Sequence, residues 1–248
     1  MPRFSTTDET TVPVVGNYFQ FSGANITNLG STEYTLVGLT VDESGSVSSF
    51  KDLLNEAVKN AVESCRKSPR ADNLLLRVTK FGDSVTEFHG FKEFKSVNVA
   101  DYDDLTNPGG MTALFDAGVD GVDAIAVQAK QLSDADFTAN AIFICITDGA
   151  NNSSSYTASK LRRVADDAIQ SESLESIRLI LVGVNPNKST ELTSYLEKFR
   201  VDAGFDQYVE IEDATPSAFA KLEEFISKSI STQSQSLGSG SGSVAVTF

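Results

Sequence analysis

The feature that most constrains the fold of this chain is a repeated alternation between continuous apolar runs and amphipathic stretches. From residue 34 onwards, runs rich in Val, Ile and Leu are separated by polar loops and by segments with apolar residues every three to four positions. Continuous apolarity is typical of strands covered on both faces. Five runs fit: "YTLVGLTV" (34–41), "NLLLRVTKF" (73–81), "AIFICIT" (141–147), "RLILVGV" (178–184) and "QYVEI" (207–211).

The stretches between these runs have helical periodicity. Helices are predicted over 50–65, 114–129, 161–169, 192–199 and 219–230, and the first of them has Ser49 and Asp52 in the places of a cap and its partner. The segment "SVTEFHGFKEF" (84–94) follows a strand directly and predicts an antiparallel edge strand. Strand, helix and strand in succession imply right-handed crossovers. The expected fold is therefore α/β: a doubly wound, mostly parallel sheet with one antiparallel edge strand and helices on both faces.

Three regions are expected along the chain. Residues 1–33, rich in Thr, Ser, Gly and Asn, predict a loosely structured arm that adds at most a short strand, and residues 34–231 form the folded domain. Residues 232–248 form a Ser/Gly-rich tail in which "GSGSGS" has the composition of a flexible linker and "VAVTF" is β-prone. Two readings of this tail stay open: a frayed end, or a short strand that docks on this sheet or on the exposed edge of a partner.

Composition excludes several classes of function. The formal charge of −14, without a basic cluster, argues against a nucleic-acid surface or an anchor to acidic membranes. No apolar run has the roughly 18 residues of a membrane span, and no signal peptide is visible, so a cytoplasmic location is expected. The two cysteines, Cys65 and Cys145, are predicted to be buried thiols. The single histidine, His89, is predicted to be an ordinary edge-strand residue, which leaves neither a His-rich zinc site nor a Ser-His-Asp triad.

Unusual polar residues gather where the predicted strands end. In doubly wound sheets, ligands bind outside the carboxyl ends of the strands. The first run ends in "DESGS", the "AIFICIT" run ends in "DG", and "NPGGMTALFDA" lies between them at the start of a helix. Two carboxylates and three hydroxyls from three loops are thus expected on one rim. These candidate metal ligands are Asp42, Ser44, Ser46, Thr112 and Asp148.

Such a set of oxygen atoms suits a hard cation, with Mg²⁺ expected and Mn²⁺ or Ca²⁺ as alternatives. A shell rich in hydroxyls leaves the ion under-neutralised, and the ion then attracts an anionic ligand. Gly45, Gly109 and Gly110 fit this picture because glycine permits positive φ and a close backbone approach. The competing reading makes the serines helix caps and the aspartates solubilising loop residues. It explains each motif separately but not the occurrence of all three in this order.

These motifs resemble the von Willebrand factor type A domain over about residues 34–230. The hallmark of that family is a metal-ion-dependent adhesion site (MIDAS), written as D-x-S-x-S, then a Thr, then Asp-Gly after an apolar strand, and "DESGS", "GGMTALFDA" and "CITDG" match it in order. The resemblance implies that Ser44, Ser46 and Thr112 contact the metal directly. It also implies that Asp42 and Asp148 bind mainly through water, and that an Asp or Glu of a protein partner completes the shell.

The surrounding sequence is more similar to stand-alone intracellular bacterial or phage members, including those associated with tellurite resistance and with MoxR-type AAA+ ATPases. The segments "TALFDA", "FDQYVE" and "ISKSISTQSQSLG" carry that similarity. Asp116, one helical turn after Thr112, is a candidate to support the metal ligands without contacting the ion itself. Glu43 lies between two candidate ligands, where it would repel an incoming carboxylate by about 0.5 to 2 kcal/mol unless it points away, which is the favoured arrangement.

The expected function is a metal-dependent module that captures an acidic residue of a protein partner, such as a MoxR-type ATPase or an assembly subunit. An enzyme is not expected. Phosphohydrolases of the haloacid dehalogenase type place a second aspartate two residues after the nucleophile, and Ser44 stands there; Walker and dinucleotide-binding motifs are also absent from the sequence. The remaining alternative is a structural subunit of a larger assembly that uses its terminal arms.

Overall fold

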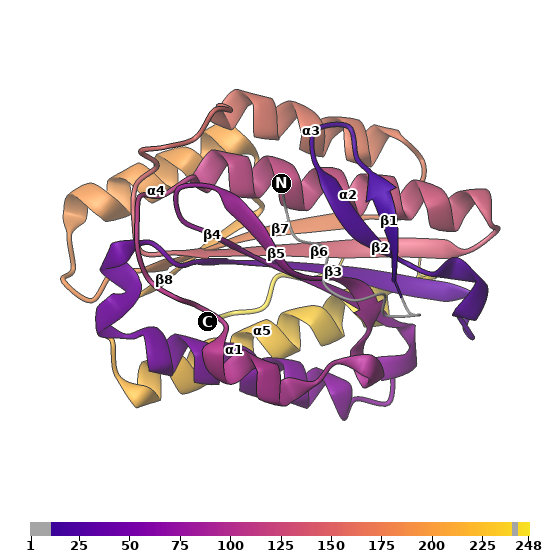
Figure 1. The fold of residues 1–248 in the computed structure, drawn as a ribbon, viewed down its shortest axis with the longest axis horizontal. Helices are drawn as coiled ribbons and strands as arrows, with labels where there is room; N and C mark the ends of the chain where they lie inside the picture. The colour runs from indigo at the N-terminus through magenta and orange to yellow at the C-terminus, as the bar shows by residue number, and fades with distance from the viewer. Residues whose placement is uncertain (1–10, 240–242) are drawn as a thin grey trace.

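The computed structural model describes residues 11–239 and 243–248, and its centre is a six-stranded sheet. The strand order is β5-β4-β3-β6-β7-β8; β5 runs antiparallel to β4, and the other neighbours are parallel (Figure 1). The predicted doubly wound α/β fold with one antiparallel edge strand is therefore confirmed. The strands are β3 (Glu33–Asp42), β4 (Leu74–Phe81), β5 (Val85–Glu93), β6 (Thr138–Thr147), β7 (Ile177–Val184) and β8 (Gln207–Ile211).

Helices cover both faces of this sheet (Figure 1). One face carries α1 (Lys51–Arg66) and α5 (Pro216–Ser236), and the other carries α2 (Leu114–Asp134), α3 (Ala158–Gln170) and α4 (Thr190–Ala203). The central strands serve both faces. In β6, Phe143 packs under α2, whereas Ile142 and Ile144 pack under α1 and α5. This two-sided burial explains why the runs are continuously apolar.

The entry into α1 differs from the prediction. A short 3-10 helix, η2 (Gly45–Ser49), follows the "DES" segment, and Phe50 is the residue that precedes α1, with no side-chain cap. Ser49 therefore belongs to η2 and does not cap α1. The chain enters α1 by stacking one helical turn on another, and the buried ring of Phe50 packs against Phe219 of α5.

The described part of the predicted N-terminal arm is a regular hairpin; residues 1–10 of that arm lie outside the described residues. Strands β1 (Thr11–Val15) and β2 (Gln20–Ala24) pair antiparallel and lie beside α2 and β5 (Figure 1). The outer edge of β2 is bonded by side chains: the Ser22 N–H donates to Glu87 (3.1 Å) and the Ala24 N–H donates to Gln128 (2.9 Å). Residues 11–24 are thus part of the packed structure.

Beneath the hairpin lies a buried ion network. Arg77 of β4 donates to both carboxylate oxygens of Asp120 on α2, at 2.7 and 3.3 Å, and to Glu87 of β5 at 2.9 Å. The ring of Phe21 in β2 lies over the guanidinium, 5.6 Å from its centroid. The hairpin therefore covers charges that would otherwise face solvent.

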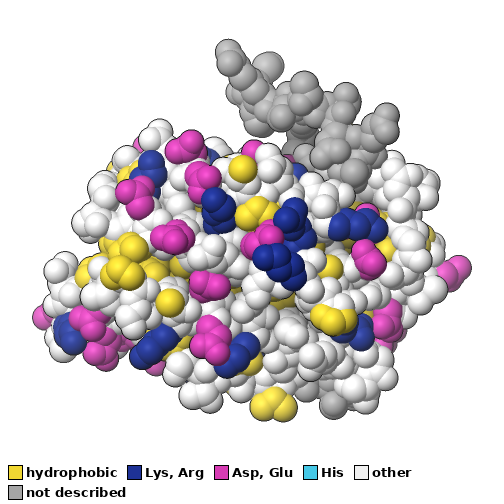
Figure 2. Space-filling model, turned by 90° about the horizontal axis from the view of Figure 1, so that it is seen from below, with side chains coloured by type: hydrophobic (Ala, Val, Ile, Leu, Met, Phe, Trp, Pro, Cys, Tyr) yellow, Lys and Arg dark blue, Asp and Glu magenta, His cyan; other side chains and the backbone are white. Residues whose placement is uncertain are grey.

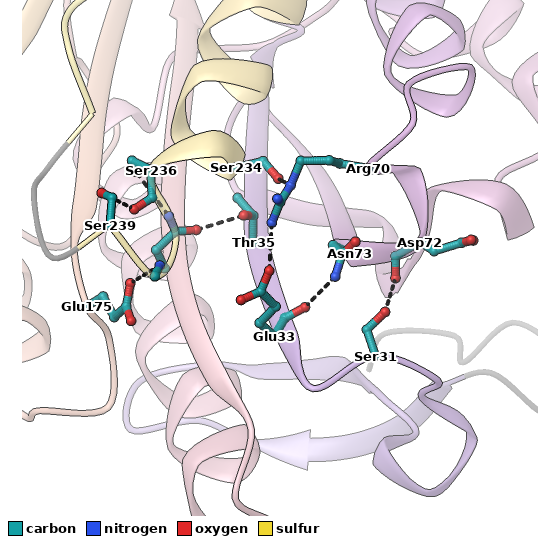
Figure 3. Close-up of polar contacts among 12 residues, drawn as sticks. Ser31, Glu33, Thr35, Arg70, Asp72, Asn73, Glu175, Ser234, Ser236 and Ser239 are labelled. Atoms are coloured by element: carbon teal, nitrogen blue, oxygen red, sulfur yellow. Dashed lines mark hydrogen bonds and ion pairs between the residues drawn. The ribbon is translucent and has the colours of Figure 1, made fainter.

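The end of the sheet opposite the candidate site holds α5 by polar contacts (Figure 3). Asn140 of β6 accepts from Thr35 and donates to the Gln233 carbonyl at 2.7 Å, and Arg70 links Ser234 to the carboxylate of Glu33. Because α5 continues to Ser236, the last helix includes the first five residues of the predicted tail, 232–236.

The two cysteines and the single histidine lie in ordinary structural positions. Cys65 and Cys145 are buried free thiols, as predicted, and His89 lies on the edge strand β5, with its Nε2 2.6 Å from the Tyr102 hydroxyl. Within residues 11–239 and 243–248, no helix is both long and apolar enough to cross a membrane. Acidic and basic side chains are interspersed on the face seen from the side of α1 and α5 (Figure 2).

Candidate metal centre

Asp42 is the last residue of β3, and it is 1% exposed where the chain turns off the sheet. One of its carboxylate oxygens accepts the Ser44 N–H at 2.8 Å, and the other accepts the hydroxyl of Thr147, the last residue of the adjacent strand β6, at 2.6 Å. Both oxygens are therefore fixed in direction. The sheet places the start of the first predicted motif directly beside the third.

A chain of short contacts joins the "DESGS" segment to Asp148. The Ser44 and Ser46 hydroxyls lie 3.1 Å apart, and the Ser46 hydroxyl donates to Asp148 Oδ1 at 2.7 Å. Ser44 is buried, whereas Ser46 is exposed at the rim. Side chains that are about 100 residues apart in sequence thus form one cluster of oxygen atoms.

Thr112 reaches the same cluster from the loop before α2. A β-carbon built on Gly149 would lie 3.4 Å from Thr112 Oγ1, which puts this hydroxyl beside the Asp148–Gly149 turn. The Thr112 N–H donates to the Asn152 side chain at 2.7 Å, and the Asn152 N–H donates back to the Thr112 carbonyl at 3.0 Å. All five predicted ligands are therefore brought to one rim of the sheet.

Backbone contacts fasten the glycine loop to the first motif. The Gly45 N–H donates to the Gly110 carbonyl at 3.3 Å, and the Gly109 N–H donates to the Glu43 carbonyl at 2.8 Å. Of these three glycines only Gly110 has positive φ, +73°, so the predicted need for left-handed backbone applies to Gly110 alone. The side chain of Asp83 lies against Gly110, where a β-carbon would be 2.7 Å from it.

The residues that position this loop system were not predicted, apart from Asp116. Asp116 accepts the Ser155 and Tyr156 N–H groups at 3.0 and 2.8 Å, so it fixes the loop that follows Asp148. Asn152, Thr147 and Asp83 were missed. For Asn152 the sequence signal is the polar stretch "GANNSSS" immediately after Asp148, and such composition is typical of many loops.

Glu43 is held in an ion pair. Its Oε2 lies 3.1 Å from Lys80 Nζ and accepts the Asn107 N–H at 3.1 Å. The lysine offsets the negative charge, and the predicted repulsion of an incoming carboxylate is reduced by this partner.

Both aspartates of the site have raised pKa values. Burial is the main cause that raises the pKa of Asp148 to about 6, and the nearby Asp42 adds to it; burial likewise raises the pKa of Asp42, against the hydrogen bonds from Ser44 and Thr147. Two carboxylates held together in a desolvated place favour a compensating positive charge. No group of three or more His, Cys, Asp or Glu side chains suited to a metal occurs in the described part of the chain, so a cation here would also need the hydroxyl oxygens and water. That donor set, of carboxylate and hydroxyl oxygens only, fits a hard cation.

Comparisons with known proteins give a match in fold but not in sequence. No family model and no curated protein matches this chain. Among solved structures it is similar to the PilB minor pilin from Streptococcus sanguinis (14% identity, 86% of this chain and 64% of that one, TM-score 0.57). It is also similar to the pilus adhesin SpaC from Lactobacillus rhamnosus GG (12%, 89% and 33%, 0.57) and to proximal thread matrix protein 1 from the mussel byssus with a zinc-occupied MIDAS motif (18%, 82% and 46%, 0.51).

These similarities establish the fold alone. Together with the strand order, they show that the chain has the doubly wound α/β fold of the von Willebrand factor type A domain. The chain spans between a third and two thirds of the length of these solved chains.

Proposed function

We propose that this chain is a metal-dependent interaction module, in which a divalent cation at the rim accepts a carboxylate of a protein partner. The observation that carries the proposal is the convergence of three separate motifs on one cluster of oxygen atoms, with Ser46 linked to Asp148 and Thr112 beside Gly149. The ligands of the cation would be Asp42, Ser44, Ser46, Thr112 and Asp148. The zinc-occupied MIDAS motif of the mussel protein supports a divalent cation in this fold, and the hard oxygen donors favour Mg²⁺ over Mn²⁺ or Ca²⁺.

The chain's own residues prepare the site in two ways. Thr147 and the Ser44 N–H fix the carboxylate of Asp42, while Asn152 fixes the Thr112 backbone, so the donors are oriented before anything binds. When bound, the cation supplies a positive charge that attracts an anionic ligand. Lys80 holds the carboxylate of Glu43, a neighbour of the ligand residues in sequence, in an ion pair, which favours entry of an acidic side chain.

Binding is proposed rather than catalysis. The position two residues after Asp42 is Ser44, and its hydroxyl contacts Ser46, so the acid/base aspartate of the phosphohydrolase arrangement has no counterpart there. The narrower similarity to intracellular bacterial or phage members, and with it a cytoplasmic location and a MoxR-type ATPase or assembly subunit as partner, is part of this proposal and rests on the sequence motifs.

The test combines direct metal binding with partner capture. Calorimetric titration with Mg²⁺ and Mn²⁺ is expected to show one site in the full chain and none in Thr112→Ala, whereas Thr190→Ala, which removes an exposed hydroxyl at the start of α4, binds as the parent does. Capture of a protein from extracts of the native cell is expected to disappear in EDTA and to return with excess Mg²⁺. Unchanged capture in the chelator, or equal metal binding by Thr112→Ala, contradicts the proposal.

A further inference from the structure

The last six residues of the chain, 243–248, lie on the chain's own domain; we name them the C-terminal segment. Their first residue is anchored by polar contacts. The Ser243 hydroxyl accepts from Arg178 Nε of β7 at 3.1 Å and donates to the side-chain oxygen of Gln233 on α5. A second Arg178 nitrogen donates to the Ser243 carbonyl. Ser243 is buried, so these contacts fix where the segment begins.

Beyond this anchor the segment runs beside α5 (Figure 1). It covers a surface formed by Arg178 of β7, Gln207 of β8, and Phe225 and Gln233 of α5, and we name this surface the groove. The side chain of Gln207, the first residue of β8, donates to the Val246 carbonyl at 2.8 Å, and Val246 packs against the core on the α5 side. The ring of Phe248 meets Phe225 of α5 edge to face, with centroids 5.7 Å apart. The groove thus provides an anchor for a serine, a contact for a valine and an aromatic contact for the final phenylalanine.

This docking is shallow. Val244 is 79% exposed, Phe248 is 41% exposed and Val246 is half-buried, so none of the three large apolar side chains is fully covered. The free energy gained by burying this small apolar area is offset by the conformational entropy lost when six residues are ordered. The segment is therefore expected to leave the groove readily, and the groove is then open to another occupant.

β8 is also the last strand of the sheet and pairs with β7 on one side. The segment lies beside this edge strand but is not a strand itself. Its contact with β8 is made by the side chain of Gln207, not by the backbone of β8. An edge strand is a template for pairing with another chain, and identical copies can exchange a segment that docks beside it.

We propose that the groove is a docking site for the C-terminal segment of a second copy of this chain, which exchanges with the chain's own segment. Every copy carries both the segment and the groove, and the contacts of Ser243, Val246 and Phe248 match this sequence. Residues 238–242 read "GSGSG", a composition typical of linkers. The proposal is independent of the metal site.

The proposal includes a concentration requirement. The contacts are the same within one copy and between two copies, so the second copy competes against a segment that is tethered by a short linker. The effective concentration of such a segment is on the order of millimolar. The dilute protein is therefore expected to be monomeric, and exchange is expected where copies are held close together.

The test uses full-length variants that separate the segment from the groove. Val246→Asp is designed to prevent the segment from docking, which leaves the groove empty. Arg178→Glu is designed to prevent the groove from binding a segment, which leaves the segment undocked. Each variant alone is expected to be monomeric. Their mixture is expected to form a 1:1 heterodimer by sedimentation equilibrium at protein concentrations up to about 1 mM. Val244→Asp is the matched control for Val246→Asp because Val244 makes no comparable contact, and it is expected to behave as the parent does.

A second measurement does not depend on Arg178→Glu. A fluorescent peptide of residues 240–248 is expected to bind Val246→Asp at least tenfold more tightly than it binds the parent or Val244→Asp, whose grooves are occupied. The same peptide with Val246→Asp is expected not to bind. Failure of the peptide to bind the empty groove overturns the docking site, and peptide binding without the heterodimer overturns exchange between copies. Metal titrations of these variants are expected to match the parent, so failure here is distinguishable from failure of the metal site.

Discussion

Removing the carboxylate of Asp120 is expected to destabilise the fold far more than removing a surface carboxylate. Arg77 is almost fully buried, with 4% of its side chain exposed, and it makes two of its three side-chain hydrogen bonds to Asp120. Asp120→Ala leaves that guanidinium with Glu87 as its one anionic partner. Breaking a buried pair in this way costs about 3 to 5 kcal/mol, because a desolvated charge loses its compensation.

The size of this effect is measurable in several ways. For a chain of this length, each kcal/mol lowers the melting temperature by roughly 2 to 4 °C, so Asp120→Ala is expected to melt about 10 °C lower than the parent. Urea unfolding followed by circular dichroism gives the free energy directly. The matched control is Asp166→Ala on α3, whose pair with Arg162 is about half exposed on both sides and is expected to contribute less than about 1 kcal/mol.

A double variant tests the reasoning itself. If the cost arises from an uncompensated charge rather than from lost packing, replacing both partners by apolar residues, Arg77→Met with Asp120→Leu, is expected to recover most of the lost stability. Hydrogen exchange at Ser22 reports the same event locally, since its N–H is bonded to Glu87 in this network. Equal destabilisation by Asp120→Ala and Asp166→Ala, or a double variant as unstable as the single one, would refute the argument.

Three further predictions concern the hairpin and the metal centre. Gly90→Ala is expected to lower the free energy of chemical unfolding by about 1 to 3 kcal/mol, because the new β-carbon would lie 2.1 Å from the Ser22 carbonyl oxygen of the hairpin. Gly30→Ala, whose β-carbon would meet no atom within 4 Å, is expected to be neutral. Similar costs for both variants contradict the close packing at Gly90. Burial, with a contribution from Asp42, raises the pKa of Asp148 from 3.8 to about 6. As pH rises from about 4 to 6, the stability of the metal-free fold is therefore expected to fall and the affinity for Mg²⁺ to rise. Calorimetric Mg²⁺ titrations at about pH 5 and pH 7.5 measure this change, and equal affinities argue against Asp148 as a ligand. Met111, which is 48% exposed beside Thr112, is expected to contact the partner. Met111→Ser should therefore weaken partner capture about fivefold and leave the Mg²⁺ affinity unchanged. A loss of metal binding in this variant would show that the role of Met111 is structural.

The sequence was sufficient to predict the fold, and it indicated which candidate ligands lie at one rim, because both leave local patterns. Strands such as β6 contain a continuous apolar run, and polar residues stand where the strands leave the sheet: Asp42 ends β3, and Asp148 follows β6. Parallel neighbours end at the same edge, so residues from distant motifs were expected to meet there.

The remaining features depend on contacts that have no sequence period. Asn152 fixes Thr112 through one side-chain oxygen, and the stretch around it reads as an ordinary loop. The hairpin was missed because its strands are short and β1 contains Pro13. Its outer edge is completed by side chains of α2 and β5, through Gln128 and Glu87, and such long-range contacts have no local signal.

The docked hairpin also bears on where the folding unit starts. Composition places the start of the domain at residue 34, yet Phe21 is buried in the core and covers the Arg77 guanidinium. A shortened chain that starts at residue 34 would expose this guanidinium together with the apolar surface around it. The unit that is suitable for expression and for biophysical work therefore includes residues 11–24, and the N-terminal segment acts as part of the domain rather than as an appendage to it.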